Sequence, residues 1–550
     1  MTIDSFASAP FNLDAEARAW VAETFARLSG EDRIRQLFVL RSFGDDPAAL
    51  AAQQAFRPGG ITRIMGANLE AEQAILAAFN AAAPVPLTVS GDLEGSRMSL
   101  PFGTMVPNPL ALAAVDDVEA TRTVCSIMAE EAHAAGYNWS FTPVLDINAA
   151  FRSAIVATRG YGSDVATIER HMLVQIEAFQ RAGIAATAKH FPGEGYDDRD
   201  QHLVTTINPL PVEEWEATFG RLYRAAILAG VMSVMSAHIA FPAFVRMANP
   251  STRQDAFRPA SISREINQGL LRERLGFNGL ILSDSTGMGG LSAWSARREH
   301  IPEIIANGCD TILFSNAPEE DAGFIAEAIG DGRLPQDRLE DAVLRNLALK
   351  AALGLHRTTQ RNSAVARPTA EKIAAADAVI RSAPTLVKDV QGLLPLSLER
   401  HRRVLVVTPG IVTPFATMPF IVPDLLRARG FEVTMHAPDQ PIEPGRHDLM
   451  LYLFGEETLL TRSHIFIDWM KLHGDLAKAM SRYWRDIPTA MVSFGYPYLL
   501  YDAPRVPTYI NAYMNAEPMQ RAVVDALCGD IPFNRNSPVD AFVGLEDARF

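Results

Sequence analysis

The segment from Lys189 to His202 gathers several side-chain types that can transfer protons. A Lys-His pair ends a short apolar run, and a loop rich in glycine and carboxylates follows, with a second histidine at His202. Asp200 and His202 are two residues apart, so in an extended segment their side chains point the same way. A carboxylate beside an imidazole fixes its tautomer and raises its basicity. The spacing therefore predicts an Asp200–His202 pair for proton transfer.

Glu194, in the same loop, is the competing proton donor. A carboxylic acid in an apolar pocket can have its pKa raised enough to donate a proton. Its neighbours Gly193 and Gly195 offer no bulk to desolvate it. We therefore expect the imidazole of His202, rather than Glu194, to be the acid/base group.

Polar residues also follow other apolar runs along the chain. Short runs rich in β-branched residues occur at 59–65, 86–92, 138–146, 184–190, 231–238, 279–285 and 310–316. Helix-period segments lie between them, at 115–135, 164–182, 212–229 and 263–275, and a further helical stretch covers 339–355. The polar residues at the ends of the runs are Asp92, Glu94, Asp146, Asn148, Lys189, His190, His238, Asp284 and Asn316.

This alternation predicts parallel βα units that are buried on both faces. In a (β/α) barrel the active site lies at the carboxyl ends of the strands, whereas an open doubly wound sheet gathers it at one switch point. Because about six runs end in polar residues, we predict an α/β protein with a TIM-like (β/α)8 barrel over residues 1–355. Residues 356–368 are polar and predict a linker, and strands at 404–408, 433–437, 448–455 and 489–494 predict a smaller α/β sandwich domain over 369–550.

Four blocks of the first domain resemble glycoside hydrolase family 3, in its β-N-acetylglucosaminidase branch. They are KHFPGEG (189–195) followed by Asp200-Gln201-His202, the block 259–285 that ends in LILSDS, DLEGSR (92–97), and FTPVLDIN (141–148) followed by RGYG (159–162). They stand in the family's order, and the second domain also resembles the family's C-terminal sandwich.

The resemblance implies a role for each matching residue. Asp284 is implied as the nucleophile that forms a covalent glycosyl-enzyme, His202 as the acid/base and Asp200 as its orienting partner. Asp92, Lys189, His190 and Arg159 are implied as the substrate-binding set. Arg159 could instead pair structurally with Asp164 or Asp146, and we interpret Glu94, Arg97 and His238 as supporting residues.

The chain departs from the family pattern at four positions. Glu194 stands where the family's usual loop has His, and Ser96 replaces a Gly. Leu100 stands where typical members have a second sugar-contacting Arg, and Ser285 follows Asp284 in place of the commoner acidic residue. Because of these changes, the sequence predicts the type of reaction better than it predicts the identity of the sugar.

The composition excludes several classes of partner. The 550 residues carry 50 Lys and Arg against 64 Asp and Glu, a formal net charge of −14, which disfavours nucleic acid and anionic membranes as partners.

Asp197, Asp198 and Asp200 lack an EF-hand register, and no His/Cys set has zinc spacing, so we expect no metal and no cofactor. The three cysteines are far apart, which predicts buried thiols rather than disulfides. The first residues show no signal-peptide pattern and no stretch reaches the length of a spanning helix, so we expect a cytoplasmic protein, with a homodimer left open.

These observations favour an exo-acting, retaining β-N-acetylhexosaminidase that releases terminal β-linked GlcNAc from a small carbohydrate, in recycling of cell-wall or chitin fragments. Two alternatives stay open. One is a family 3 enzyme of the β-glucosidase or phosphorylase type, because a deprotonated imidazole is not anionic and would not repel phosphate. The other is a non-catalytic sugar-binding protein. Since the first domain already supplies His202, we also predict that the second domain carries no catalytic proton donor.

Overall fold

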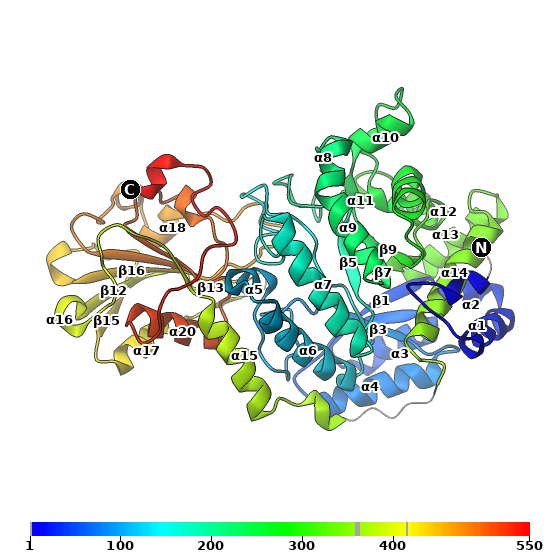
Figure 1. Cartoon of the computed structure of the whole chain (residues 1–550), viewed down its shortest axis with the longest axis horizontal. Coiled ribbons are helices and arrows are strands. Elements are labelled where there is room, and N and C mark those ends of the chain that lie inside the picture. Colours follow the sequence, from blue (N-terminus) through cyan, green and yellow to red (C-terminus); the bar gives the residue numbers. More distant parts are fainter. Residues whose placement is uncertain (1–2, 358–362, 414–415) are drawn as a thin grey trace.

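The computed structural model describes residues 3–357, 363–413 and 416–550, and its first domain is built on eight parallel strands. Helices surround this sheet, and a second sheet lies at the other end of the molecule (Figure 1). Around the first sheet the order is β4-β3-β2-β1-β10-β9-β7-β5. The strands are β1 (Phe38–Phe43), β2 (Gly60–Ile64), β3 (Thr88–Gly91), β4 (Trp139–Ser140), β5 (Thr187–Phe191), β7 (Ser233–Ser236), β9 (Leu280–Ser285) and β10 (Thr311–Leu313).

The ends of this sheet meet between β4 and β5. Isolated parallel bridges join Trp139 to Ala185 and Val144 to Lys189, and the Leu145 amide donates to the Lys189 carbonyl at 2.7 Å. The predicted (β/α)8 barrel is therefore confirmed. Strand β1 is absent from the sequence-based prediction, because Arg41 and Ser42 interrupt its apolar run at the barrel mouth.

The first domain contains fourteen α-helices in its described residues. They are α1 (Ala15–Arg27), α2 (Gly30–Arg35), α3 (Pro47–Phe56), α4 (Leu69–Ala82), α5 (Pro109–Val115), α6 (Val118–Ala135), α7 (Val165–Arg181), α8 (Val212–Ala217), α9 (Phe219–Leu228), α10 (Pro242–Ala248), α11 (Gly289–Ser292), α12 (Arg297–Ala306), α13 (Pro318–Gly330) and α14 (Gln336–Ala352). Asp117 and Asp164 cap α6 and α7 by accepting hydrogen bonds from amides of the first turn. The helix predicted at 212–229 is divided at Thr218, and the one predicted at 263–275 is a π-helix (Glu265–Arg274). A small sheet pairs β6 (Thr206–Ile207) with β8 (Ile239–Ala240).

The second domain is a six-stranded mixed sheet, in the order β11-β18-β17-β16-β12-β15. Only β11 runs antiparallel to its neighbour. Its strands are β11 (Thr385–Asp389), β12 (Arg403–Val407), β15 (Glu432–Met435), β16 (Leu449–Phe454), β17 (Thr489–Ser493) and β18 (Thr508–Asn511), beside a two-stranded ribbon of β13 (Ile411–Val412) and β14 (Thr417–Met418). Its helices are α15 (Ala370–Ser382), α16 (Leu398–His401), α17 (Val422–Ala428), α18 (Trp469–His473), α19 (Leu476–Met480) and α20 (Glu517–Leu527). The predicted α/β domain is confirmed; residues 358–362 of the predicted linker lie outside the described residues.

A buried carboxylate joins the two domains. Glu457 follows β16, and its Oε1 accepts hydrogen bonds from Ser96 Oγ of the barrel at 2.8 Å and from the Asn515 amide at 2.9 Å. Its Oε2 lies 3.3 Å from the donor Asn108 Nδ2. Ser96 has a φ of 51°, in the left-handed region that favours glycine. The serine therefore replaces the family's glycine in a strained conformation and gains a contact with the second domain.

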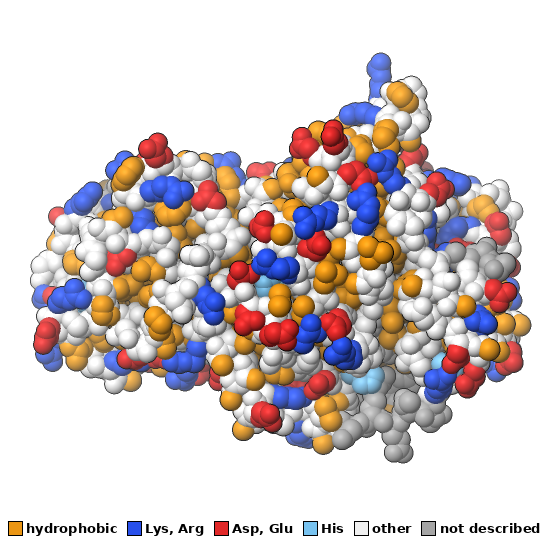
Figure 2. All heavy atoms as spheres, viewed as in Figure 1, with side chains coloured by type: hydrophobic (Ala, Val, Ile, Leu, Met, Phe, Trp, Pro, Cys, Tyr) orange, Lys and Arg blue, Asp and Glu red, His pale blue; other side chains and the backbone are white. Residues whose placement is uncertain are grey.

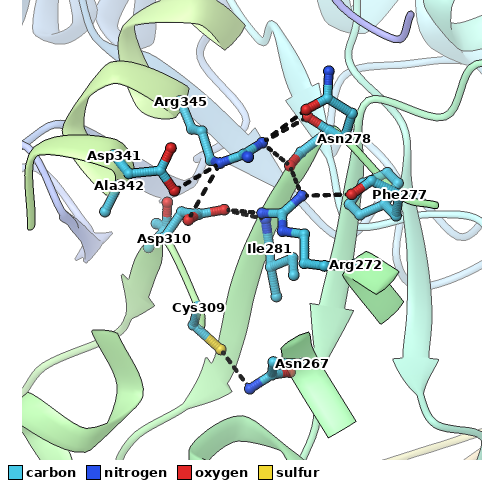
Figure 3. Close-up of polar contacts among 12 residues, drawn as sticks. Asn267, Arg272, Phe277, Asn278, Ile281, Cys309, Asp310, Asp341, Ala342 and Arg345 are labelled. Carbon is cyan, nitrogen blue, oxygen red and sulfur yellow. Dashed lines mark hydrogen bonds and ion pairs between the residues drawn. The ribbon is translucent and has the colours of Figure 1, made fainter. Parts of the chain in front are cut away.

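The base of the barrel is held by a buried charge cluster. Asp310, at the start of β10, accepts from Arg272 Nη2 at 2.7 Å and from the Ile281 amide at 2.8 Å (Figure 3). Arg338 Nη2 donates to its other oxygen at 2.6 Å. Burial lowers the pKa of Arg272 to about 9. This cluster lies at the amino-terminal ends of β9 and β10 and is structural.

On the face of the molecule drawn in Figure 2, acidic and basic side chains are interspersed. Among the described helices, none combines the length and hydropathy that crossing a membrane requires.

The Ser96–Glu457 contact gives the first testable prediction. Ser96→Ala removes a donor from a buried carboxylate and should lower the free energy of unfolding by about 1–3 kcal/mol. Ser99→Ala is the matched control in the same loop, because Ser99 Oγ has no hydrogen-bond partner in the part of the chain that the structure describes. Urea denaturation of both variants measures the difference. Equal losses in the two variants would show that Ser96 does not stabilise the interface.

Candidate active site

The predicted nucleophile, Asp284, lies on β9 at the barrel mouth, where the strand ends. Its carboxylate is half-buried, and Oδ1 accepts from the Ser285 amide at 2.7 Å. Burial alone would raise the pKa of Asp284, but the nearby His190, His238 and His202 outweigh it and lower the pKa. The carboxylate is therefore ionised at neutral pH, as a nucleophile must be.

The predicted Asp200–His202 pair is formed, but in a turn and not in the extended segment that the spacing assumed, because the Leu203 and Val204 amides donate to the Asp200 carbonyl at 2.9 and 3.0 Å. His202 Nδ1 lies 2.7 Å from Asp200 Oδ1, and the same oxygen accepts from the His202 amide at 2.8 Å. Burial raises the pKa of Asp200, but its hydrogen bonds with His202 outweigh burial and lower it. The His202 side chain is 26% exposed, so its other ring nitrogen can reach a ligand.

The second domain also holds this pair, which the sequence did not reveal. Asp200 Oδ2 accepts a hydrogen bond from the Thr461 amide at 2.8 Å. Thr461 has a φ of 64°, and it lies 261 residues away from Asp200 in the sequence. Backbone donors leave no side-chain pattern, so no signal in the sequence could have identified this contact.

Backbone contacts join the loop of the pair to the loop that follows Asp284. The Gly289 amide donates to the His202 carbonyl at 2.8 Å, and the Gly290 amide to the Gln201 carbonyl at 3.1 Å. A Cβ at Gly290 would approach the Gln201 carbonyl oxygen to 2.5 Å. Glycine is therefore required where the two loops meet.

Lys189, Arg159 and Asp92, from the predicted substrate-binding set, meet through Glu94. Lys189 Nζ lies 2.6 Å from Asp92 Oδ1 and 2.7 Å from Glu94 Oε1. Arg159 donates to both oxygens of Glu94, each at 2.9 Å. Burial would raise the pKa of Glu94, but the positive charges of Arg159 and Lys189 outweigh it and hold the pKa far below its usual value.

This pairing decides between the alternatives for Arg159. Its partner is Glu94 rather than Asp164 or Asp146. Asp92, although paired with Lys189, keeps 34% of its side-chain surface exposed.

His190, the fourth residue of the predicted substrate-binding set, is oriented by Asp146. Asp146 Oδ2 lies 2.5 Å from His190 Nδ1, and its Oδ1 accepts from the His190 amide at 3.1 Å. His190 Nε2 lies 3.5 Å from Arg159 Nη2. The sequence placed Asp146 at a strand end but did not pair it with His190, because that partner comes from the neighbouring strand.

Asp146, His190 and Glu194 are the group with metal-ligand spacing found among the described residues, with ligand atoms within 4.8 Å of one another. The Asp146–His190 hydrogen bond already occupies two of these atoms. Asp146 thus positions the His190 ring, and Glu194 Oε2 lies 3.5 Å from the same ring nitrogen.

Comparison with known proteins agrees with this geometry. A family model described as "Glycosyl hydrolase family 3 N terminal domain" matches residues 39–349, which carry every residue of the site described so far except Thr461. The chain belongs to glycosyl hydrolase family 3. It is therefore a glycosidase that acts on β-linked sugars.

Three relatives show how far this family membership extends. A Cellulomonas fimi protein named β-N-acetylglucosaminidase/β-glucosidase is 39% identical and covers 98% of this chain and 99% of its own length. A Vibrio cholerae β-hexosaminidase is 33% identical over 48% of this chain and 76% of its own length. A solved structure described as a β-glucoside phosphorylase bound to 2FGlc has a TM-score of 0.93 and 32% identity, over 99% of this chain and 100% of its own.

Glu194 of this family 3 enzyme is buried, which contradicts the prediction from its glycine neighbours. Only 2% of its side chain is exposed. Burial, followed by the charges of Asp146 and Asp284, raises its pKa well above the usual value. Gly195 approaches so closely that a Cβ would lie 1.9 Å from the Ile147 carbonyl oxygen. The loop is folded against the barrel, so distant residues desolvate Glu194 although its neighbours cannot.

Gln201 links Glu194 to the nucleophile side of the site. Its Nε2 donates to Glu194 Oε2 at 2.9 Å, and its Oε1 accepts from the His238 amide at 3.1 Å. His238 Nε2 lies 2.9 Å from the Ser285 carbonyl oxygen. Gln201 stands between the two members of the proton-transfer pair, and its buried side chain fixes their loop to the barrel.

The second prediction concerns the charge of Glu194. Because its pKa is raised in the folded state, the folded protein holds a proton that the unfolded chain releases above the ordinary value of 4.5. Relative to Glu194→Gln, the wild-type free energy of unfolding should therefore fall as the pH rises above that value, by up to about 1.4 kcal/mol per pH unit. Denaturation at pH 4 to 9 measures this, with exposed Glu213→Gln as the control. A wild-type free energy of unfolding that stays level or rises with pH, relative to that of Glu194→Gln, would mean that Glu194 is ionised in the fold.

Proposed function

We propose that this chain is an exo-acting, retaining glycosidase that releases terminal β-linked GlcNAc through a covalent glycosyl-enzyme. The observation that carries the proposal is the partly exposed His202, paired with Asp200 on a loop bonded to the segment after Asp284. The three groups thus share one barrel mouth, and a nucleophile and a proton donor there are what a retaining mechanism needs.

In the first step, an Asp284 oxygen attacks the anomeric carbon while the bond from that carbon to the leaving oxygen breaks. His202, as the imidazolium, gives its Nε2 proton to the leaving oxygen and keeps the Nδ1 proton toward Asp200. In the second step, His202 Nε2 takes a proton from water as the water oxygen attacks the anomeric carbon, and the bond to Asp284 breaks. Asp200 stabilises the imidazolium in both steps.

Four residues support binding of the terminal sugar in this proposal. Asp92 accepts hydroxyl groups, while Lys189, Arg159 and His190 lie beside it as donors. GlcNAc is favoured because the name of the Cellulomonas fimi relative includes β-N-acetylglucosaminidase beside β-glucosidase, and the Vibrio cholerae relative is named a β-hexosaminidase. A panel of nitrophenyl β-glycosides tests it: turnover of the GlcNAc compound alone supports the proposal, turnover of the glucoside alone favours a β-glucosidase type, and turnover of none favours a sugar-binding protein.

Phosphorolysis is the second candidate reaction. A deprotonated His202 is neutral and does not repel an anionic acceptor, whereas a glutamate in its place would. The solved structure described as a β-glucoside phosphorylase matches this chain over 99% of its length. In this reaction a phosphate oxygen replaces water in the second step, and the product is the sugar 1-phosphate.

The second domain in this proposal orients and supports the site. It fixes Asp200 through the Thr461 amide, and its buried Glu457 accepts hydrogen bonds from Ser96 and Asn515. Glu457 is therefore occupied at the interface, and we assign the proton donor to the barrel.

The third prediction tests the nucleophile. Asp284→Asn should lower turnover by about 10⁴-fold or more while the far-UV circular dichroism stays unchanged, because the amide cannot form the ester. A 2-fluoro or 5-fluoro glycosyl donor should label the wild type at Asp284, as peptide mapping by mass spectrometry will show. A label at Glu194 or Asp92 would refute the assignment.

The fourth prediction separates His202 from Glu194 as the proton donor. His202→Ala should keep fast glycosylation with a dinitrophenyl glycoside, lose about 10²- to 10⁴-fold with poor leaving groups, and regain rate with azide or formate. Glu194→Gln is the matched variant: it keeps an acceptor for Gln201 Nε2 and should show no such dependence on the leaving group. Azide rescue of Glu194→Gln but not of His202→Ala would assign the proton to the carboxylic acid.

A further inference from the structure

Arg41 lies at the barrel mouth and has no role in the chemistry described so far. On β1 it is paired in register with Thr62 of β2, which is paired in turn with Ser90 of β3. Register partners in a sheet point to the same face, and Asp92 follows Ser90 by two residues. Arg41 and Asp92 are thus on the inner face of the barrel, toward the sugar-binding groups.

The guanidinium of Arg41 lies close to the nucleophile segment. Its Nη2 is 3.5 Å from the hydroxyl oxygen of Ser285, the residue after Asp284. It also packs over the ring of Phe314, 5.0 Å from the ring centroid, at the end of β10. These contacts hold the cation between β1, β9 and β10 without neutralising it.

Within the described ranges, the charge of Arg41 has no counterion. The side chain is exposed, and among the described residues no carboxylate forms an ion pair with it. Lys189 and Arg159, the other cations described here on the inner face, are buried against Asp92 and Glu94. The chain has a net charge of −14, so its overall electrostatic field repels anions. The exposed, unpaired arginine at the barrel mouth supplies a local positive charge.

Apolar surface lies beside this cation. Phe43 and Ile64 are register partners at the ends of β1 and β2, and each is 53% exposed. The centroid of the Phe43 ring is 5.7 Å from the Arg41 guanidinium. An unpaired guanidinium next to exposed apolar side chains suits a ligand that carries an anionic group, which arginine binds with charge-assisted hydrogen bonds.

We propose that Arg41, with the Ser285 hydroxyl, binds an anionic group beside the nucleophile. This group belongs either to inorganic phosphate that attacks the glycosyl-enzyme or to a carboxylate on the aglycone. The inference rests on the proposed function and adds to it a binding site for an anionic group next to Ser285. In the phosphate case the P–O oxygen forms a bond to the anomeric carbon as the bond to Asp284 breaks, and the carboxylate of Asp284 leaves with the electron pair.

The test uses two ratios measured on the full-length wild type, Arg41→Met and Arg41→Lys. The first ratio is the turnover of a neutral nitrophenyl glycoside with inorganic phosphate over that without it. The second is kcat/KM for a carboxyl-substituted nitrophenyl glycoside over that for its neutral parent. Arg41→Met keeps the aliphatic stem over Phe314 and removes the charge, and Arg246→Met, an exposed arginine on α10, is the control.

We expect Arg41→Met to lower one of these ratios by about tenfold to a hundredfold, the usual effect of losing a charge-assisted hydrogen bond. Arg41→Lys should restore part of the loss. A fall in the first ratio identifies phosphate as the ligand, and a fall in the second identifies an anionic aglycone. Equal ratios in wild type and Arg41→Met for both measurements overturn the proposal. Labelling of Asp284 and turnover of the neutral glycoside test the proposed function separately, so the two failures are distinguishable.

Discussion

Asp200 connects the proton-transfer residue to both domains, and the arrangement of the site depends on it. One of its oxygens accepts from His202, and the other accepts from the Thr461 amide of the second domain. A carboxylate with both oxygens engaged in this way has a fixed plane, so the imidazole bonded to it has a fixed direction. The position of the second domain therefore determines the orientation of a group on the barrel, although in our proposal that domain supplies no proton donor.

Burial is the second constraint at the barrel mouth, because a buried carboxylate without a nearby cation takes up a proton and becomes neutral. Glu94 stays ionised since Arg159 and Lys189 both contact it. Among the described residues Glu194 forms no ion pair with a lysine or arginine, and its pKa rises. Glu94 is thus anionic and Glu194 neutral, and their different environments account for the difference. A neutral Glu194 can support the loop through Gln201 without adding a second negative charge near Asp284.

The sequence predicted the features that arise from local patterns. Alternating apolar runs identified seven of the barrel strands, and polar strand ends identified Asp92, Lys189, His190 and Asp284 as neighbours. Closeness in the sequence also identified the Asp200–His202 pair, although a turn and not the assumed extended segment brings the two side chains together. Local patterns did not predict the burial of Glu194, because parts of the chain remote from its glycine neighbours desolvate it. They also did not predict β1, because Arg41 and Ser42 interrupt its apolar run. The Thr461 contact comes from a backbone amide and has no sequence signature.

The central claim is that Asp200 fixes the tautomer of His202, with the proton on Nδ1 and with Nε2 left for the substrate. Nitrogen-15 NMR of the histidine rings in uniformly labelled protein tests this directly, with His202→Gln used to assign the signal. At a pH where the ring is neutral, we predict that His202 Nδ1 is protonated and Nε2 is not, and that Asp200→Asn removes this preference. A neutral ring protonated on Nε2 in the wild type would contradict the account.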